Sequence, residues 1–155
     1  MTNLYERTDE EGQSKVIPIL KKLFEKYNPI FEQHYKDKGR IDIFMYLGNV
    51  RYAIECKDRK FEHFKYPSIM IEPHKYQALK SIIDSKTKSI YFNTFADDTF
   101  VVWDMSKVSY TEKEVYSPIS TVENKGKKMQ LKYFIPFEDA VYKGRVSDIV
   151  DSNPL

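Results

Sequence analysis

The sequence predicts a mixed α/β fold, and three observations support this. A helical repeat of apolar residues near the N-terminus is followed by two runs of strict apolar–polar alternation that meet at Gly48-Asn49. A second helical repeat begins at Pro73, and further alternating runs follow it. The resulting order of helix, two strands, helix and two strands, with a β-rich end, is typical of a mixed β-sheet flanked by helices.

Length and composition restrict the class of protein. The chain has 155 residues, of which 41% are hydrophobic and 15% aromatic, so it can bury a core as a single domain, 1–155. No apolar stretch approaches the roughly 18–20 residues of a membrane span, and the polar, acidic start does not resemble a signal peptide. We therefore expect no membrane association.

The charge balance and the single cysteine indicate which partners and which cell compartment are compatible with the sequence. The net charge of +2 permits a nucleic-acid partner without demanding one. Cys56 alone can form neither an internal disulfide nor a zinc site, which favours a reducing, cytoplasmic compartment. The sequence contains no phosphate-binding glycine loop, dinucleotide fingerprint, nucleophile elbow or zinc-protease motif, and we expect no organic cofactor.

The first helix is expected over roughly Asp9 to Tyr27. Thr8 followed by Glu11 fits a capping box at its start. Pro18 argues against an unbroken helix, because proline removes a backbone donor and clashes with the preceding turn. The helix is therefore expected either to kink there or to begin near Ser14. Its buried stripe consists of Val16, Leu20, Leu23, Phe24 and Tyr27.

The stretch from Arg40 to Lys57 predicts a β-hairpin with a defined register. A two-residue Gly48-Asn49 loop suits a type II′ turn, which places Leu47 opposite Val50. One sheet face is then entirely apolar, and on the other face Asp42 lies opposite Glu55. Directly opposed residues have Cβ atoms about 4.5–5.5 Å apart, so two carboxylates become neighbours.

The rest of the chain gives a coarser prediction. Asp58 to Glu72 is expected to have no regular structure, and a helix is expected from Pro73, a favoured first helical residue. Further strands are expected over Ser89–Thr94 and Thr99–Trp103, with a final hairpin formed by Val115–Val122 and Met129–Ile135.

Asp42 opposite Glu55 predicts chemistry, because opposed like charges destabilise a sheet unless something compensates them. Mg²⁺ binds oxygen ligands and is often held by one or two carboxylates. Lys57, two residues beyond Glu55 on the same face, could help to activate a water against a phosphodiester. The alternative is that Glu55 and Lys57 are solvent-facing strand residues and that Lys57 neutralises both acids without any metal.

Asp42, followed by Ile54-Glu55-Cys56-Lys57 at the end of a hairpin, resembles the PD-(D/E)XK nuclease superfamily, although Ile41 replaces the proline of that motif. The superfamily includes Holliday-junction resolvases, restriction enzymes and phage nucleases. The resemblance implies a restriction-endonuclease-like fold, a mixed β-sheet flanked by helices, over about residues 6–104. Residues 105–155 would form a C-terminal extension with a β-hairpin.

The resemblance also implies roles for individual residues. Asp42, Glu55 and the Cys56 carbonyl would bind Mg²⁺, for which Mn²⁺ is expected to substitute, and Lys57 would orient or help to deprotonate the attacking water. Many members carry a further acid on the first helix. We choose Glu10 for it, with Gln13 as the alternative. Gln77 matches a polar residue that several members have on the helix after the motif.

Basic residues after the motif are candidates for contacts with a DNA backbone. The candidates are Arg59, Lys60, Lys65 and Lys75. A basic loop can equally be a solvated surface. A homodimer would be needed to cut two DNA strands symmetrically.

The resemblance implies an Mg²⁺-dependent endodeoxyribonuclease, and the small size favours a structure-directed enzyme such as a Holliday-junction resolvase. A phage gene expressed in a bacterial host is compatible with this interpretation. Two alternatives remain open: a restriction or repair-type DNA endonuclease, and a catalytically inactive module with the nuclease fold that binds nucleic acid or protein.

Overall fold

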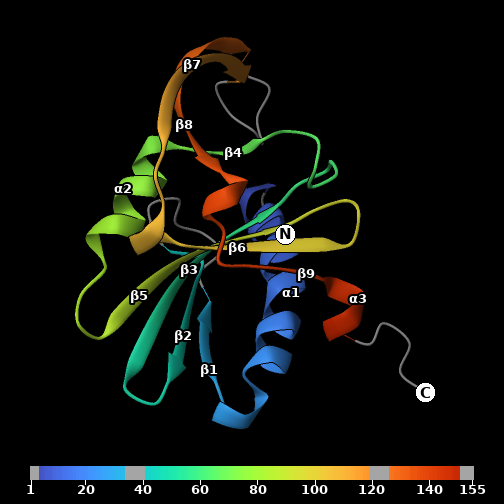
Figure 1. The fold of residues 1–155 in the computed structure, drawn as a ribbon, viewed down its shortest axis with the longest axis vertical. Coiled ribbons are helices and arrows are strands. Elements are labelled where there is room, and N and C mark those ends of the chain that lie inside the picture. The colour runs from blue at the N-terminus through green and yellow to red at the C-terminus, as the bar shows by residue number, and fades with distance from the viewer. Residues whose placement is uncertain (1–3, 34–40, 119–125, 151–155) are drawn as a thin grey trace.

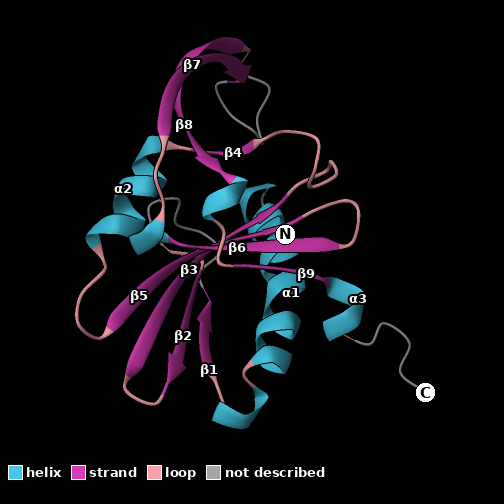
Figure 2. Ribbon diagram, in the orientation of Figure 1, coloured by secondary structure: helices cyan, strands magenta, loops and turns pink. Residues whose placement is uncertain are grey.

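The computed structural model describes residues 4–33, 41–118 and 126–150, and the side chains only from Gly12 onward. Figures 1 and 2 show a mixed α/β fold with helices beside a twisted sheet. The helices are α1 (Leu4–Leu23), α2 (Pro73–Ser81) and α3 (Val146–Ile149). The strands are β1 (Ile30–Gln33), β2 (Ile43–Leu47), β3 (Val50–Asp58), β4 (Ser68–Ile71), β5 (Thr87–Thr94), β6 (Thr99–Asp104), β7 (Thr111–Pro118), β8 (Lys127–Pro136) and β9 (Tyr142–Arg145).

Six strands form one mixed sheet in the order β1-β2-β3-β5-β6-β9, and a second sheet has the order β4-β8-β7. Strands β3 and β5 are parallel, with α2 between them in the chain, while the other strand pairs are antiparallel. The fold class predicted from the sequence is therefore confirmed as a mixed α/β fold. The β7–β8 hairpin projects from the body of the molecule (Figure 1).

The predicted hairpin register is confirmed in the β2–β3 ladder. Leu47 pairs with Val50, and the alignment continues along the hairpin to Ile43 opposite Ile54. Gly48 has a φ of 60°, while Asn49 has no positive φ. A type II′ turn requires this pattern at its two central positions, which explains why glycine comes first.

Both faces of the large sheet are buried, whereas the sequence predicted a single apolar face. On one face, α1 packs against Ile43, Met45, Ile54 and Cys56, and Cys56 is 8% exposed, as expected for a core thiol. On the other face, Ala53, Tyr91 and Trp103 form a core with residues of α2 and the smaller sheet. Glu55 lies on this second face, so it is covered rather than exposed to solvent.

The first helix differs from its prediction. It runs without interruption from Leu4 to Leu23, so Thr8 and Glu11 lie inside it and do not cap its start. Pro18 is accommodated within the helix because it lies on the exposed side, where water can satisfy the carbonyl group that loses its donor. The helix ends four residues before Tyr27, which belongs to a short 3₁₀ turn.

Several strands were not predicted. The segment expected to be irregular contains the end of β3 and all of β4, whose Ile69 and Ile71 are buried at alternate positions. Strand β1, strand β9 and helix α3 were also missed. The final hairpin exists, with β7 beginning at Thr111, but Val122 lies outside the described residues.

Asp58 joins three elements, and we expect it to stabilise the fold. It accepts hydrogen bonds from Lys15 of α1 (2.7 Å), from Lys60 (2.6 Å) and from Thr94 of β5 (2.8 Å). Burial acts to raise the pKa of Asp58, but these hydrogen bonds outweigh it and lower the pKa below the ordinary value. The folded state therefore favours the carboxylate, and this stability is present above about pH 4 and lost as the pH falls below it.

Asp58→Asn is expected to lower the free energy of unfolding by about 1–2 kcal/mol at pH 7, because it removes the charge that both lysines contact. The loss is no larger because both lysines are exposed, so that solvent weakens their attraction to the carboxylate. Urea unfolding at pH 7 and at pH 3 measures the difference, which should shrink at the lower pH. Asp148→Asn, at an exposed position of α3, is the control. An equal effect of both substitutions at pH 7 would contradict this role.

Candidate active site

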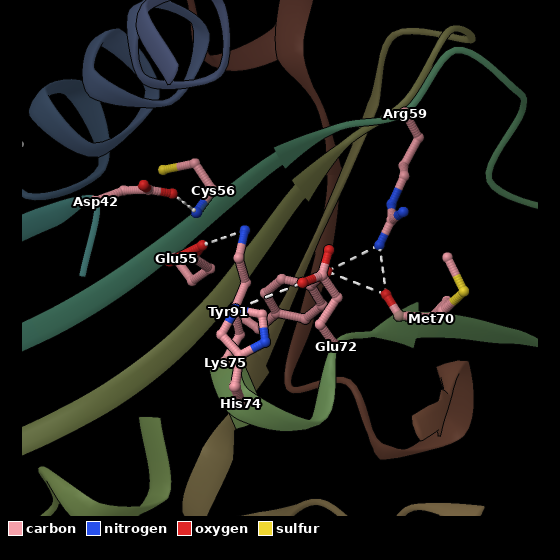
Figure 3. A network of polar contacts seen from close by, with 9 residues as sticks. All are labelled: Asp42, Glu55, Cys56, Arg59, Met70, Glu72, His74, Lys75 and Tyr91. Carbon is pink, nitrogen blue, oxygen red and sulfur yellow. Dashed lines mark hydrogen bonds and ion pairs between the residues drawn. The ribbon is translucent and has the colours of Figure 1, made fainter. Parts of the chain in front are cut away.

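The β2–β3 hairpin brings the two predicted carboxylates to one place. Asp42 directly precedes β2, and its Oδ2 accepts a hydrogen bond from the backbone N–H of Cys56 at 2.9 Å (Figure 3). Glu55 is the residue before Cys56, so this bond fixes the Asp42 carboxylate beside the Glu55 position. Asp42 is 9% exposed and Glu55 is 4% exposed. The described pairing of β2 with β3 ends at Ile43 and Ile54. Asp42 is therefore held by this side-chain hydrogen bond and not by pairing between the strands.

Lys75, in the first turn of α2, supplies a cation to this pair of acids. Its Nζ lies 3.1 Å from Glu55 Oε1, and Figure 3 shows it pointing from the helix toward Glu55. Burial acts to lower the pKa of Lys75, but the charges of Glu55 and Asp42 outweigh it and raise the pKa above the ordinary value. Both carboxylates therefore act on the same ammonium group. The sequence pointed to Lys75 only as a phosphate contact.

Lys57 follows Glu55 on the same face of β3. Its pKa is lowered to about 8, first by burial and then by the positive charges of Arg59 and Lys75. The charges of Glu72 and Glu55 partly oppose this shift. Lys57 is thus a lysine whose neutral form is accessible near neutral pH.

Arg59 is buried and binds protein atoms. Its Nε donates to Asn93 Oδ1 (2.8 Å), and its Nη2 donates to the Met70 carbonyl (2.6 Å) and to the Tyr91 hydroxyl (2.8 Å). The side chain is 8% exposed, because the chain beyond β3 continues along the covered face beside β5. The sequence pointed to Arg59 for the lining of an open DNA groove. A contact between Arg59 and nucleic acid stays a prediction.

The remaining predicted residues lie in different surroundings. Lys60 is exposed and pairs with Asp58, which faces α1 on the opposite side of the sheet. Lys65 lies over the ring of Tyr66, 5.6 Å from its centroid, and Gln77 is exposed on α2. The side chain of Glu10 lies outside the described residues. The alternative, Gln13, is fully buried and accepts a hydrogen bond from Gln33 at 3.3 Å.

Three residues of the cluster were missed in the sequence. Tyr91 and Asn93 lie next to Glu55 and Lys57 in the parallel β3–β5 ladder, and Glu72 precedes α2. Asn93 is fully buried, and among the described residues its Nδ2 has no hydrogen-bond partner. The available signal was an asparagine directly after the apolar run Ile90-Tyr91-Phe92, but only the parallel pairing relates it to the motif.

The carboxylates fit a hard divalent cation by their chemistry. Asp42 and Glu55 are buried oxygen donors held close to one ammonium group, and Mg²⁺ takes such ligands with the help of backbone carbonyls and waters. Within the described part of the chain, no three His, Cys, Asp or Glu side chains form a metal-binding group. The Cys56 carbonyl as a further ligand stays a prediction, as does the acid from the first helix, because the side chain of Glu10 lies outside the described residues.

Comparisons with known proteins bear on the fold. No protein-family model and no curated protein matches the sequence. Among the solved structures, the chain is similar to Hjc, a Holliday junction resolvase from the archaeal hyperthermophile Archaeoglobus fulgidus. The TM-score is 0.54 at 9% sequence identity, and the match covers 90% of this chain and 94% of that chain. No helix among the described residues is long and apolar enough to cross a membrane.

The similarity at this low identity concerns the fold and not the activity. It extends over 90% of this chain. The resemblance suggested by the sequence motif is therefore confirmed for the fold: the chain has the fold of a PD-(D/E)XK nuclease, as found in an archaeal Holliday junction resolvase.

Proposed function

We propose that this protein is a divalent-metal-dependent endonuclease that hydrolyses phosphodiester bonds in DNA, with branched DNA such as a four-way junction as its substrate. The observation that carries the proposal is the placement of Asp42, Glu55 and Lys57. Both carboxylates are buried, Asp42 is bonded to the backbone of Cys56, the residue after Glu55, and Lys57 follows on the same strand. The fold around them is that of a known resolvase.

Each residue of the cluster has a part in this proposal. Asp42, Glu55 and the Cys56 carbonyl would hold Mg²⁺, which when bound supplies positive charge against the charge that develops on phosphate. Lys57 has a lowered pKa and is suited to orient a water and to take up its proton. Lys75 holds Glu55 in place and presents a second cation toward the position of a phosphate.

The ion pair between Lys75 and Glu55 also favours a second candidate. An ammonium 3.1 Å from the carboxylate can neutralise part of the acidic cluster without any metal. The cluster would then be a structural feature of a module that binds nucleic acid or protein and cuts nothing. Divalent-cation binding separates the two candidates, because a cation has to compete with Lys75 for Glu55.

The experiment is a cleavage assay on the purified full chain. Supercoiled plasmid, linear duplex, single-stranded DNA, a four-way junction and an RNA control are incubated with Mg²⁺, with Mn²⁺ or with EDTA. We expect the junction to be cut with either metal and to remain intact in EDTA. Symmetrical incision of two opposing strands by one complex would support a homodimer.

Each outcome has a defined meaning. Preference for duplex over the junction would favour a restriction or repair-type endonuclease. Folded protein that binds the junction but cuts nothing with either metal would overturn the catalytic proposal in favour of the inactive module. Calorimetric titration with Mn²⁺ gives an independent answer, since the metal-free candidate predicts no binding.

A further inference from the structure

Lys132 of β8 is a buried lysine with no counter-ion among the described residues. The residue is 7% exposed, and its neighbour across the β7–β8 ladder is another lysine, Lys113. In the described part of the chain, its ammonium group makes no hydrogen bond or ion pair. Lysine is almost never buried to this extent without a partner, because a buried charge is costly unless it is compensated.

The ammonium group of Lys132 is not sealed from solvent. Among the described residues, the side-chain nitrogen and oxygen atoms that are fully buried and have no hydrogen-bond partner belong to Ser89, Asn93, Asp97 and Ser117. The Nζ atom of Lys132 is not one of them, so it retains some exposure to solvent. Lys132 lines a cavity of about 420 Å³. The cavity is lined by Lys128, Met129, Gln130, Leu131 and Lys132 of β8 and by Glu72, Pro73 and His74 at the start of α2.

The cavity combines groups that attract an anion. Lys128 and Lys132 are cationic, and the N-terminus of α2, a helix of nine residues, carries the positive end of the helix dipole. The single carboxylate in the lining is that of Glu72, which lies 3.4 Å from His74 Nε2 and 37% exposed. The positively charged groups therefore outnumber the negative one, and the most buried of them is unpaired.

The cavity adjoins the candidate active site through the first turn of α2. Glu72, which lines the cavity, is close enough for its charge to act on Lys57, and Lys75 reaches Glu55 one residue after His74. Figure 3 shows Glu72, His74 and Lys75 together on this turn, with the side chain of Lys75 reaching Glu55. A chain of phosphate groups that passes over the turn would meet the cavity on one side and the carboxylates on the other.

We propose that this cavity binds a phosphate group of the nucleic-acid backbone and that Lys132 is its principal contact. The proposal rests on the proposed function, because it assigns to the same substrate a second contact away from the reacting bond. A bound phosphate would be the counter-ion that Lys132 does not find among the described residues. The lysine then costs stability in the free protein and contributes affinity in the complex.

The test compares Lys132→Met with Lys21→Met in the full chain. Lys21 is exposed on α1, on the opposite face of the sheet, so the control removes the same charge from another surface. We measure thermal melting with and without inorganic phosphate, and binding of a labelled four-way junction in EDTA across a series of salt concentrations. Lys132→Arg keeps the charge and serves as the rescue variant.

Lys132→Met is expected to melt at the same temperature as the wild type or higher, because it removes an uncompensated buried charge. Its affinity for the junction should fall about tenfold, and the slope of log affinity against log salt should become shallower by about one. Phosphate should raise the melting temperature of the wild type but not that of this variant. Lys21→Met and Lys132→Arg should keep the wild-type slope and the phosphate effect.

The outcomes separate this proposal from the function on which it rests. If the wild type cuts the junction and Lys132→Met binds with unchanged affinity and slope, the phosphate site is overturned and the nuclease stands. If the wild type neither cuts nor binds DNA, the proposed function fails. In that case, loss of the phosphate effect in Lys132→Met still supports an anion site, and an absent phosphate effect in the wild type overturns it.

Discussion

Asp42→Asn is expected to reduce Mg²⁺-dependent cleavage of a DNA junction by about 10²–10³-fold or more, a usual cost of removing one group that stabilises charge in the transition state. Asparagine has nearly the same shape and can still accept the hydrogen bond from the Cys56 N–H, which holds residue 42 at the hairpin. The substitution therefore removes the charge and keeps the local contact. Initial rates under saturating metal measure the loss.

The stability of the same variant separates chemistry from folding. Asp42 is buried near Glu55, so replacing one of two like charges should leave the unfolding transition within about 1 kcal/mol of the wild type. Asp84→Asn is the matched control, because exposed Asp84 also accepts a backbone hydrogen bond, from Lys86 N–H at 2.8 Å. Cleavage by Asp42→Asn at the wild-type rate would show that Asp42 takes no part in catalysis.

Arg59→Met is expected to lower the free energy of unfolding by about 3 kcal/mol or more, the largest stability effect we anticipate from one substitution. The change removes the donor that Asn93 Oδ1 and the Met70 carbonyl share in the folded protein, although the carbonyl keeps the hydrogen bond from the Tyr91 hydroxyl at 3.2 Å. Both atoms lie where β3, β5 and β4 meet, so the cost falls on the contact between the two sheets. Urea unfolding measures it.

Lys60→Met is the control for this substitution, because Lys60 is the next residue and its side chain is 75% exposed. Its effect on stability should stay within about 0.5 kcal/mol. The same pair of variants tests the role in DNA binding that the sequence suggested for both residues. Arg59→Met with wild-type stability and weakened DNA binding would reverse our structural interpretation of Arg59.

The motif-bearing hairpin illustrates what local sequence can predict. Register follows from the turn and from the two-residue period of a strand, and both can be counted along the chain without knowledge of distant contacts. The pairing of Leu47 with Val50 and of Ile43 with Ile54 was predicted in this way and is observed. The register brings Asp42 to the Glu55 end of the hairpin, where its hydrogen bond from the Cys56 N–H holds it.

The basic residues illustrate the opposite case. Arg59, Lys60 and Lys75 are all basic, and the sequence suggested a contact with the DNA backbone for each of them. In the structure, Arg59 is buried against β5, Lys60 turns toward Asp58, and Lys75 is paired with Glu55. These differences arise from the parallel pairing of β3 with β5 and from the position of α2, which are set by contacts between distant segments.

The sequence by itself determined the class of the fold, the hairpin and its register, the second helix, and the acids and lysine of the candidate site. Each of these depends on periodicity, turn chemistry or the spacing of a motif within about twenty residues. Only the tertiary structure decided that both sheet faces are covered, that β4 pairs with β8, and that β9 completes the large sheet. It also decided that Lys132 is buried beside α2 with no partner in the part of the chain that the structure describes. Burial and charge compensation are properties of packing, and packing joins residues that are far apart in the chain.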